Sequence, residues 1–390
     1  MNKLDSSCLG KEFDAGGEAI VYQVKNSNLI AKIYHKNKLN KDKINKIKIM
    51  VDKYQNNKYL KELFLNKQPQ IIWPTKLVVD KGKVIGYAMK QVKNPLPLSN
   101  LIENINIGKY KKSFFSFQDR VKISLKIIKG IKKLHQNHIF AGDLNDNNIL
   151  ITEDKNVYFI DSDSYQFKES NKLYKCNVAM PGFCSPNFSP GEKLNDKDDI
   201  FALGIIIFKL FYDNLHPFHG KDKKGRNLKV QQKINKGLYP HTSRNINPLA
   251  KFKILSKQLV NKELWELFKQ TFQRNQRSRP SLTELSKVLK QYLNELKECP
   301  INSNHYYHYK KNKCPWCEYK VKMGEEVFPE PKTSSSTNKN RKKNKSTTFL
   351  KEVEKLRKQR IAEAKVKYDL YQPEKDNWRK AVNSLANGEL

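Results

Sequence analysis

The sequence of 390 residues lacks any apolar run long enough to cross a membrane. A spanning helix needs roughly 20 apolar residues, and the longest candidate, FALGIIIFKLFY at 201–212, is interrupted by Lys209. The first residues, MNKLDSSCLGKEF, lack the succession of basic, apolar and small residues that marks a signal peptide. We therefore expect a soluble cytoplasmic protein without a membrane partner, in which 201–212 is a buried helix.

Cysteine is also scarce. The six cysteines are too scattered for the disulfide framework of a small secreted domain. We expect free thiols in a reducing compartment at Cys8, Cys176 and Cys184. The other three gather near the end of the sequence in a CxxC context, which indicates a metal site.

Acidic residues are few beside basic ones. Asp and Glu number 39 against 75 Lys and Arg, which gives a formal net charge of +36 and invites a nucleic-acid interpretation. However, the basic residues are mostly Lys and are spread along the whole chain, whereas base and phosphate readers tend to use Arg. Together with the abundance of Asn and Ile, this favours a compositional bias. We expect only weak, non-specific nucleic-acid binding.

Apolar periodicity predicts two different folded parts. Residues 1–93 are expected to be mostly strand with one helical segment. The pattern predicts three short strands over 11–35, a helix or two over 40–66 and a hairpin over 71–92. Residues 94–297 are expected to be mainly helical, with helical spacing over 118–136, 198–213, 248–273 and 281–297.

Three shorter segments follow the helical part. Residues 298–320 are too dense in Cys, His and Tyr for another helix, so 298–328 are expected to form a separate module. Residues 329–348 have the composition of a flexible linker. Residues 349–390 are charged, with a helical pattern and a partial apolar stripe. Three interpretations of this tail stay open: a solvated helix, a coiled-coil partner site and a nucleic-acid contact.

Four polar residues stand in the order that phosphoryl transfer from ATP requires. Asp143 and Asn148 lie in FAGDLNDNNILI with the spacing D-x-x-x-x-N, and Asp161 ends the apolar strand VYFI. Lys32 lies upstream, in a strand that follows the glycine turn of AGGEAIVY. The chemistry needs a lysine for the phosphates, a carboxylate and an amide for the metal, and a carboxylate that accepts the hydroxyl proton. Each motif alone is also a common turn, but their joint order favours a site.

The sequence resembles the protein-kinase superfamily from about residue 10 to 297. The resemblance is carried by AGGEAIVY, IIWP, GYAMKQV, GDLNDNNIL, FIDSDS and LHPF. It is nearest to a bacterial kinase-like family with a GGEG-type glycine loop and a C-terminal CPWC zinc ribbon, related to helix-hairpin-helix and tellurite-resistance-associated kinases. Some members are encoded beside a phosphatase and a von Willebrand A-domain protein. The resemblance implies an α+β bilobal fold, ATP and Mg²⁺ as cofactors, and a protein substrate or a regulatory partner of those two kinds.

The same resemblance implies a role for each matching residue. Asp143 corresponds to the catalytic aspartate and Lys32 to the strand lysine, while Asn148 and Asp161 correspond to Mg²⁺ ligands. Asp199 corresponds to the buried aspartate that anchors the catalytic loop. Residues expected around ATP are those of the phosphate-covering turn, the adenine pocket and the hinge: Gly16, Gly17, Val21, Ala31, Met89, Lys90, Gln91 and Val92.

The chain departs from the kinase pattern around the phosphates. Asp14 and Ala19 replace the first and third glycines of the GxGxxG turn. No confident glutamate partner for Lys32 is found, because Asn45 stands where it is expected and Glu62 comes too late. Asn145 stands where kinases often have a lysine, which leaves the neutralisation of transition-state charge open.

Further departures concern regulation. The HRD triplet is Ala141-Gly142-Asp143, so the arginine that receives a phosphorylated activation loop is missing, and we predict no regulation of that kind. The DFG triplet is Asp161-Ser162-Asp163, and Asn187 replaces the glutamate that would pair with Arg279. Two hypotheses therefore stay open: a Ser/Thr-type protein kinase, and a pseudokinase that binds ATP and presents its ribbon to partners. His135 and His216 are expected to be structural.

A second motif predicts a structural zinc site. Cys299, His305, Cys314 and Cys317 are spaced C-x5-H-x8-C-x2-C, a donor set that suits a closed tetrahedral zinc ion. His308 is an alternative ligand, although the resemblance favours His305, and a CxxC redox pair is the alternative chemistry. So small a module cannot bury a core, so zinc should supply its folding energy. We expect it to dock a partner or the kinase body.

Overall fold

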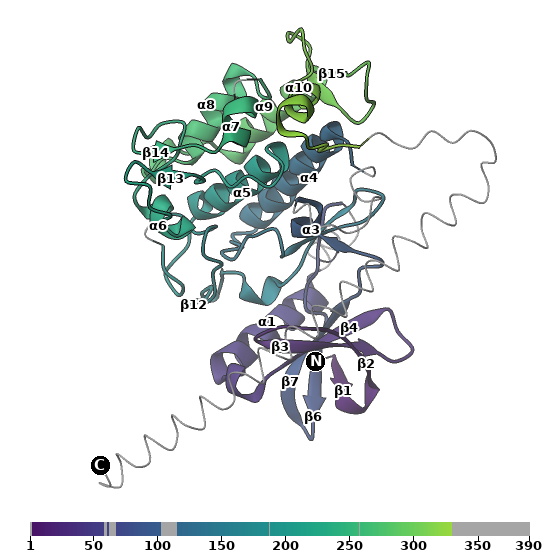
Figure 1. Cartoon of the computed structure of the whole chain (residues 1–390). Coiled ribbons are helices and arrows are strands. Elements are labelled where there is room, and N and C mark those ends of the chain that lie inside the picture. Colours follow the sequence, from purple (N-terminus) through teal and green to yellow (C-terminus); the bar gives the residue numbers. More distant parts are fainter. Residues whose placement is uncertain are drawn as a thin grey trace, which may run out of the picture. The chain divides into compact units, whose positions relative to one another are not determined.

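The computed structural model describes residues 2–57, 61, 68–102, 115–186, 188–256 and 258–329. These residues form two compact units (Figure 1). Among the described residues, the first unit lies within Met1–Leu60 and Trp73–Asn94, and the second lies within Lys61–Ile72 and the chain from Pro95 to Pro329. The predicted linker after Pro329, the predicted tail, Glu62 and Asn187 all lie outside the described residues.

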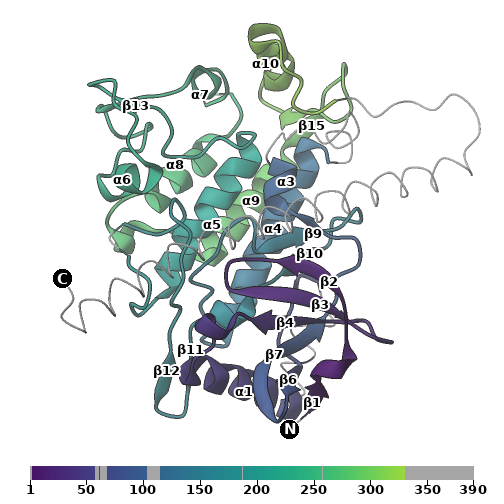
Figure 2. The same cartoon turned by 60° about the horizontal axis from the view of Figure 1, so that its bottom comes forward.

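A six-stranded sheet forms the first unit, in the order β1-β6-β7-β4-β3-β2 (Figure 2). The strands predicted over 11–35 and 71–92 are confirmed. β1 was not predicted, because it has only three residues and pairs in parallel with the distant β6. The strands are β1 (Lys3–Asp5), β2 (Leu9–Ala15), β3 (Ala19–Val24), β4 (Leu29–Tyr34), β6 (Lys76–Asp80) and β7 (Lys83–Lys90).

One helix, α1 (Lys41–Asn56), packs on β6 and β7 of this sheet. It begins at Asn40, whose side chain accepts a hydrogen bond from the Lys43 N–H and so caps the helix. Ile47, Met50 and Val51, spaced for one helix face, are fully buried. The helix predicted over 40–66 is thus confirmed as far as Asn56.

Helices dominate the second unit, and α4 and α5 run side by side through it (Figure 1). α5 is buried from Asp198 to Phe211, which confirms the buried helix predicted at 201–212. No helix within the described ranges has the length and apolar character needed to cross a membrane. The helices are α3 (Leu98–Ile102), α4 (Phe117–Gln136), α5 (Asp196–Phe211), α6 (Val230–Asn235), α7 (Ala250–Leu255), α8 (Lys262–Thr271), α9 (Leu282–Asn294) and α10 (Pro315–Met323).

The helical pattern predicted over 248–273 corresponds to two helices, not one. α7 ends at Leu255, and α8 begins after Asn261, whose side chain caps the new helix by accepting the Leu264 N–H. The apolar spacing continues across the break, so periodicity alone did not reveal it.

Short strands complete the second unit. A four-stranded sheet has the order β5-β10-β9-β8. β5 comes from a segment predicted to belong with residues 1–93, but it pairs with β10 of the second unit. The strands are β5 (Gln70–Ile71), β8 (Leu96–Pro97), β9 (Ile149–Ile151), β10 (Val157–Phe159) and the antiparallel pairs β11 (Phe167–Glu169) with β12 (Lys172–Tyr174), β13 (Lys221–Asp222) with β14 (Ile246–Asn247), and β15 (Leu296–Glu298) with β16 (Tyr306–His308).

Candidate active site and metal centre

Asp199, near the start of α5, anchors the loop that carries Asp143. Asp199 lies in the first turn of α5 and is 1% exposed. Its carboxylate accepts the backbone N–H groups of Ala141 and Gly142 at 2.8 and 2.9 Å. It also contacts His135 Nε2 at 2.9 Å. The predicted anchoring role of Asp199 and the structural role of His135 are therefore confirmed.

Hydrogen bonds from both sides orient the Asp143 carboxylate. Asn148 Nδ2 donates to Asp143 Oδ2 at 3.1 Å and to its carbonyl at 2.9 Å. Asn145 Nδ2 donates to Oδ1 at 3.1 Å, and the Met180 backbone N–H donates to the same oxygen at 2.8 Å. The structure thus brings together Asp143 and Asn148, the first pair of the predicted site.

The surroundings of Asp143 raise the pKa of its carboxyl group. Burial is the largest cause, and the negative charge of Asp161 adds to it. The Met180 N–H and the amides of Asn145 and Asn148 lower the pKa, but they do not cancel the increase. A carboxylate with a raised pKa is a better proton acceptor than an ordinary exposed aspartate.

Asp161 follows β10 and has an unusual backbone conformation. Its φ is +63° and its ψ is 33°, a left-handed conformation that residues other than glycine seldom adopt. The segment is held beside the loop that carries Asp143 because the Ile160 N–H donates to the Asn148 carbonyl at 3.0 Å. Such conformations concentrate at functional sites.

Asn145 is a loop-forming residue, a role that the sequence analysis missed. It is 2% exposed. Its Nδ2 is turned toward Asp143, and its Oδ1 accepts the N–H groups of Asn147 and Asn148 at 3.0 and 3.3 Å. The Asx-turn tendency of an Asn followed by two further polar residues was the available signal.

A buried ion pair beneath the loop was also missed. Lys209 of α5 contacts Asp146 of the loop that carries Asp143, and both side chains are largely buried. Lys209 is the residue that interrupts the apolar run at 201–212. A lone lysine in an otherwise apolar helix was the signal, because a buried ammonium group requires a partner.

The chain around Gly182, in the segment after Asp161, is held by side-chain hydrogen bonds that do not require a phosphorylated residue. Gly182 donates its N–H to Gln231 Oε1 at 2.9 Å, and its carbonyl accepts a hydrogen bond from His216 Nε2 at 2.8 Å. Burial lowers the pKa of His216 to about 3, so the ring is neutral and structural, as predicted.

Arg279 is almost fully buried in the same unit. Its Nη1 donates to the Lys197 carbonyl at 2.9 Å, and the guanidinium lies over the Phe201 ring. Within the described part of the chain, Nε and Nη2 have no hydrogen-bond partner. Burial lowers its pKa to about 10, although Asp198 opposes the decrease.

In the first unit, the register of the sheet gathers three predicted ATP-site residues on one face. Lys32 of β4 is 6% exposed and lies opposite Val21 of β3. Ile30, two residues before Lys32, lies opposite Met89 of β7. Because side chains alternate along a strand, Val21, Ile30, Lys32 and Met89 share one face.

Ala31 lies on the other face of the sheet, and its predicted role near ATP requires correction. It is fully buried in an apolar cluster with Val24, Val78 and Ala88. Ile30 is the residue whose position matches the prediction, since it shares the Lys32 face.

The glycine turn between β2 and β3 leaves open space around Gly16 and Gly17. A Cβ atom added to Gly17 would meet nothing within 4 Å, and one on Gly16 would meet only the Ala19 carbonyl at 3.9 Å. The packing of the chain itself therefore does not require these glycines. Glu18 of this turn pairs with Lys43 of α1 at 3.0 Å.

The predicted hinge residues follow directly from β7. Lys90 is the last residue of that strand, and the Gln91 N–H donates to the Asn28 carbonyl at 2.9 Å. Val92 is 8% exposed. The chain therefore leaves the sheet after Lys90, and the hinge role of Lys90, Gln91 and Val92 stays a prediction.

Cys299, His305, Cys314 and Cys317 form a compact donor cluster in the second unit. All four donor atoms lie within 4.8 Å of one another. The Sγ atoms of Cys299 and Cys317 are 3.7 Å apart, and His305 Nδ1 is 3.5 Å from Cys317 Sγ. A tetrahedral ion with Zn–S bonds of about 2.3 Å places its sulfur ligands about 3.8 Å apart. The cluster therefore fits a zinc ion.

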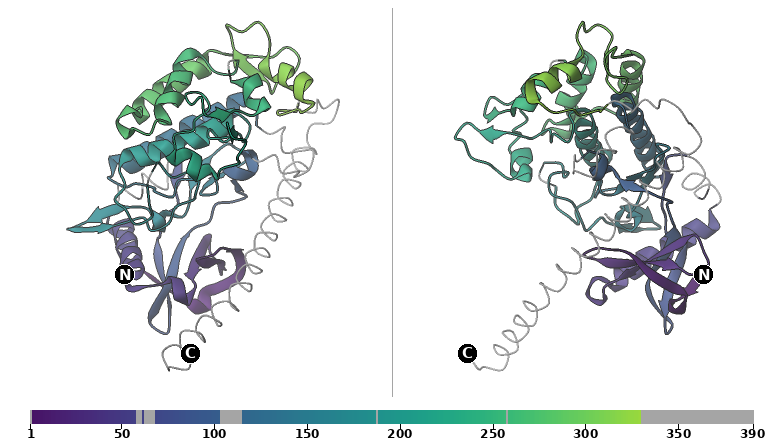
Figure 3. Two further views of the ribbon diagram at one scale, coloured as in Figure 1. Left: turned by 60° about the vertical axis from the view of Figure 1, so that its left-hand side comes forward. Right: turned by 45° about the vertical axis from the view of Figure 1, so that its right-hand side comes forward.

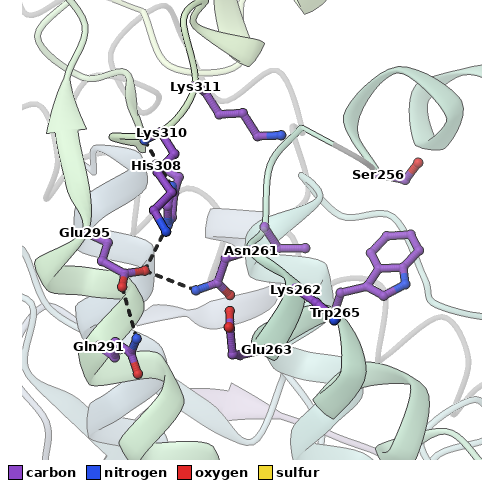
Figure 4. Close-up of a pocket in the computed structure, with 11 residues that line it drawn as sticks. Ser256, Asn261, Lys262, Glu263, Trp265, Gln291, Glu295, His308, Lys310 and Lys311 are labelled. Carbon is purple, nitrogen blue, oxygen red and sulfur yellow. Dashed lines mark hydrogen bonds and ion pairs between the residues drawn. The ribbon is translucent and has the colours of Figure 1, made fainter.

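His308, the alternative ligand, is engaged elsewhere. Its Nε2 contacts Glu295 at 2.8 Å, and its Nδ1 accepts the Lys310 N–H at 3.2 Å. It lines a cavity of about 480 Å³ between α8, α9 and β16, where Figure 4 shows its ring pointing toward Glu295. His305 is therefore the histidine of the cluster.

Comparison with known proteins identifies the family. The model of the protein kinase domain matches residues 9–291. The chain is 25% identical over 344 residues to protein kinase YegI of Escherichia coli strain K12. This alignment covers 82% of the chain and 51% of that protein. A shorter stretch of 110 residues is 31% identical to rhodopsin kinase GRK1 of Rattus norvegicus and covers 28% of the chain and 19% of that kinase.

The chain therefore belongs to the protein kinase domain family. It spans about half the length of the YegI proteins that it matches in two E. coli strains. The match begins in β2 and ends in α9, so the Cys and His cluster lies beyond it.

Proposed function

We propose that the chain is a protein kinase of the Ser/Thr type that depends on ATP and Mg²⁺. The observation that carries the proposal is the Asp143 carboxylate, which is oriented by three hydrogen-bond donors and has a raised pKa. Asp143 would orient the acceptor hydroxyl and take its proton.

The other polar residues would hold the nucleotide and its metal. ATP supplies the phosphoryl group, and Mg²⁺ neutralises charge on its phosphates. The amide nitrogen of Asn148 donates to Asp143, so its amide oxygen would be the atom that binds the cation. The carboxylate of Asp161 would be the second ligand. Lys32 would pair with phosphate oxygens, and the backbone of Gly16 and Gly17 would cover them.

The adenine side of the site would be apolar. Val21, Ile30 and Met89 share the Lys32 face of the sheet, and the Lys90–Val92 segment would follow the edge of the base. Ile30 takes the place first predicted for Ala31.

The binding part of the proposal is tested by calorimetry. Wild-type protein should bind ATP with an affinity that rises when Mg²⁺ is added, and Asp161→Asn should lose most of that increase. Asp154→Asn, which removes an exposed aspartate after β9, is the matched control. An affinity that is equal with and without Mg²⁺ would contradict the metal role of Asp161.

A pseudokinase is the second candidate, and Asn145 favours it. The amide at this position is buried and turned back onto the loop, so it supplies no positive charge to a transferring phosphate. A pseudokinase would bind ATP and Mg²⁺ without turnover, and would act by presenting its surfaces to partners. The protein substrate or regulatory partner, such as a phosphatase or a von Willebrand A-domain protein, is proposed from the sequence resemblance.

We also propose that the Cys and His cluster binds a structural zinc ion. Four protein donors close the coordination shell, so the ion would have no open position for catalysis. Metal analysis should find one zinc ion per chain, and Cys314→Ser should lose it. Cys176→Ser, at a buried thiol outside the cluster, should keep it. A Cys314→Ser protein with stoichiometric zinc would contradict the assignment.

A further inference from the structure

We propose that zinc binding stabilises the helices that anchor the catalytic loop, and that Glu326 and Phe328 couple the two. This inference rests on the zinc site proposed above. The ribbon, residues 298–329, packs against the helices of the second unit (Figure 3). The coupling path consists of contacts between the metal site, the turn after α10 and the start of α4.

The first contact of the path is between His305 and Glu326. His305 Nδ1 faces the thiols, at 3.5 and 3.8 Å from the Sγ atoms of Cys317 and Cys314. Its Nε2 points the other way and contacts Glu326 Oε1 at 2.8 Å. A carboxylate on the outer nitrogen of a metal-binding histidine fixes its tautomer and its orientation.

The second contact carries the path from Glu326 to Phe328. The same Oε1 atom accepts the Phe328 N–H at 3.1 Å. Asn302 Nδ2 also donates to the Phe328 carbonyl at 2.9 Å. The N–H of Phe328 is therefore held by Glu326, which contacts His305. The carbonyl of Phe328 is held by Asn302, three residues before His305.

The third contact joins the ribbon to α4. Phe328 is fully buried, and its ring centroid is 4.8 Å from that of Trp316 and 6.1 Å from that of Phe117. The guanidinium of Arg120 lies 4.5 Å from the centre of the Phe328 ring. The Phe117 N–H donates to the Asn304 carbonyl at 3.1 Å. The ribbon thus covers the first turn of α4.

Beneath Phe328 lies a buried ion pair between α4 and Asp213, the second residue after α5. Arg120 Nη1 is 3.4 Å from Asp213 Oδ1, and the two side chains are 3% and 0% exposed. Lys251 contacts the other Asp213 oxygen at 2.7 Å. Since Phe328 shields this pair, displacing the ribbon would admit water to charges that are now buried.

The same helices hold the catalytic loop at their other ends. α4 begins at Phe117 and carries His135 near its end, while α5 begins beside Asp199 and ends at Phe211. His135 and Asp199 form the loop anchor, and the rings of Phe117 and Phe211 meet 5.4 Å apart beneath the ribbon. The ribbon therefore secures the helix ends remote from the loop.

Hydrogen exchange of the full chain tests this coupling. We expect zinc removal by a chelator to speed amide exchange in residues 117–124 by about 10- to 100-fold, the effect of losing one or two aromatic contacts and the shielded ion pair. Phe328→Ala should keep one zinc ion per chain, yet exchange quickly at 117–124 with or without zinc. Val321→Ala truncates an exposed side chain of α10 and should behave as wild type.

Glu326→Gln removes the negative charge beside His305 but keeps an Oε1 atom that can accept the Phe328 N–H, so it tests the metal end of the path alone. Its zinc affinity should fall by about 10- to 100-fold, while exchange at 117–124 in the zinc-saturated variant should match wild type. If Phe328→Ala does not fold, Phe328→Leu removes the ring contacts and retains an apolar side chain.

Two results would overturn the coupling. One is equal exchange at 117–124 in zinc-loaded and zinc-depleted wild type, and the other is the same zinc dependence in the Phe328 variant as in Val321→Ala. A wild-type protein without zinc refutes the metal site itself, whereas bound zinc without an effect on α4 refutes only the coupling.

Discussion

At the residue scale, Asn145 and Met180 determine the state of the Asp143 carboxylate. Both donate a hydrogen bond to Asp143 Oδ1. These hydrogen bonds lower a pKa that burial and the charge of Asp161 raise. The balance sets the pH below which Asp143 is protonated and no longer accepts a proton.

Asn145→Ala should therefore shift the acid limb of the pH profile. Removal of the amide raises the pKa of Asp143 further, so kcat/KM should begin to fall at a higher pH than in wild type. Asn245→Ala, at an exposed position, is the control. An acid limb that stays in place, or moves to lower pH, would show that Asn145 does not act on Asp143.

Much of the site was predictable at this scale, and the exceptions have physical reasons. Asp143 and Asn148 were predicted because a D-x-x-x-x-N loop leaves a clear trace in the sequence, and Asp199 was predicted from the resemblance to protein kinases. The role of Asn145 depends on where its amide turns. Ala31 was misplaced by one residue, although strand alternation from Lys32 indicates Ile30.

At the element scale, close packing between α4 and β10 sets a strict limit on side-chain size. Gly130 lies in the middle of α4, and a Cβ atom there would come within 2.1 Å of the Phe159 ring. Phe159 is 1% exposed and is the last residue of β10, two residues before Asp161. The glycine thus allows the helix to approach the strand that leads to Asp161.

Gly130→Ala should destabilise the protein by about 1–3 kcal/mol, because the ring or the helix must move. Alanine would otherwise favour a helix by about 1 kcal/mol over glycine, so the sign of the effect is diagnostic. Lys129→Ala on the exposed face of α4 should be nearly neutral. Denaturant unfolding measures both, and a more stable Gly130→Ala protein would exclude the close contact.

Elements were predicted where periodicity is long and missed where it is short. α4 and α5 each bury a long stretch and were predicted nearly end to end. β1 and β5 have three and two residues, and each pairs with a strand far along the sequence. Such pairing is decided by tertiary contacts, which no local pattern encodes.

At the scale of the whole molecule, three histidine rings that are largely shielded from water tie stability to pH. Burial lowers the pKa of His216 and of His241 to about 3 and that of His219 to about 4. These rings are neutral in the folded protein, but the unfolded chain takes up protons near the ordinary histidine pKa of about 6.5. Their contribution to stability is therefore complete above that pH and declines below it.

Stability should fall by up to about 1.4 kcal/mol per pH unit for each such histidine below pH ~6.5. His241→Phe removes one of these histidines. His241 lies in an aromatic cluster, and neither of its ring nitrogens has a hydrogen-bond partner among the described residues. Its unfolding free energy should depend less steeply on pH than that of wild type between pH 5 and 6.5.

His138→Asn is the matched control, because His138 is exposed and its positive φ of 54° suits asparagine. Its pH dependence should equal that of wild type. If the unfolding free energy of His241→Phe depends on pH as steeply as that of wild type, the His241 ring is not held in its neutral form by burial.

The central claim, that this kinase-family chain transfers phosphate, is tested most directly by turnover of γ-labelled ATP. Wild-type protein with Mg²⁺ and a serine- and threonine-rich acceptor should transfer label, and Asp143→Asn should lose at least about a hundredfold of that rate while retaining ATP binding. Asp154→Asn should match wild type. Binding of ATP and Mg²⁺ by the wild-type protein, without label on any acceptor or on the chain itself, would contradict the kinase account and favour the pseudokinase.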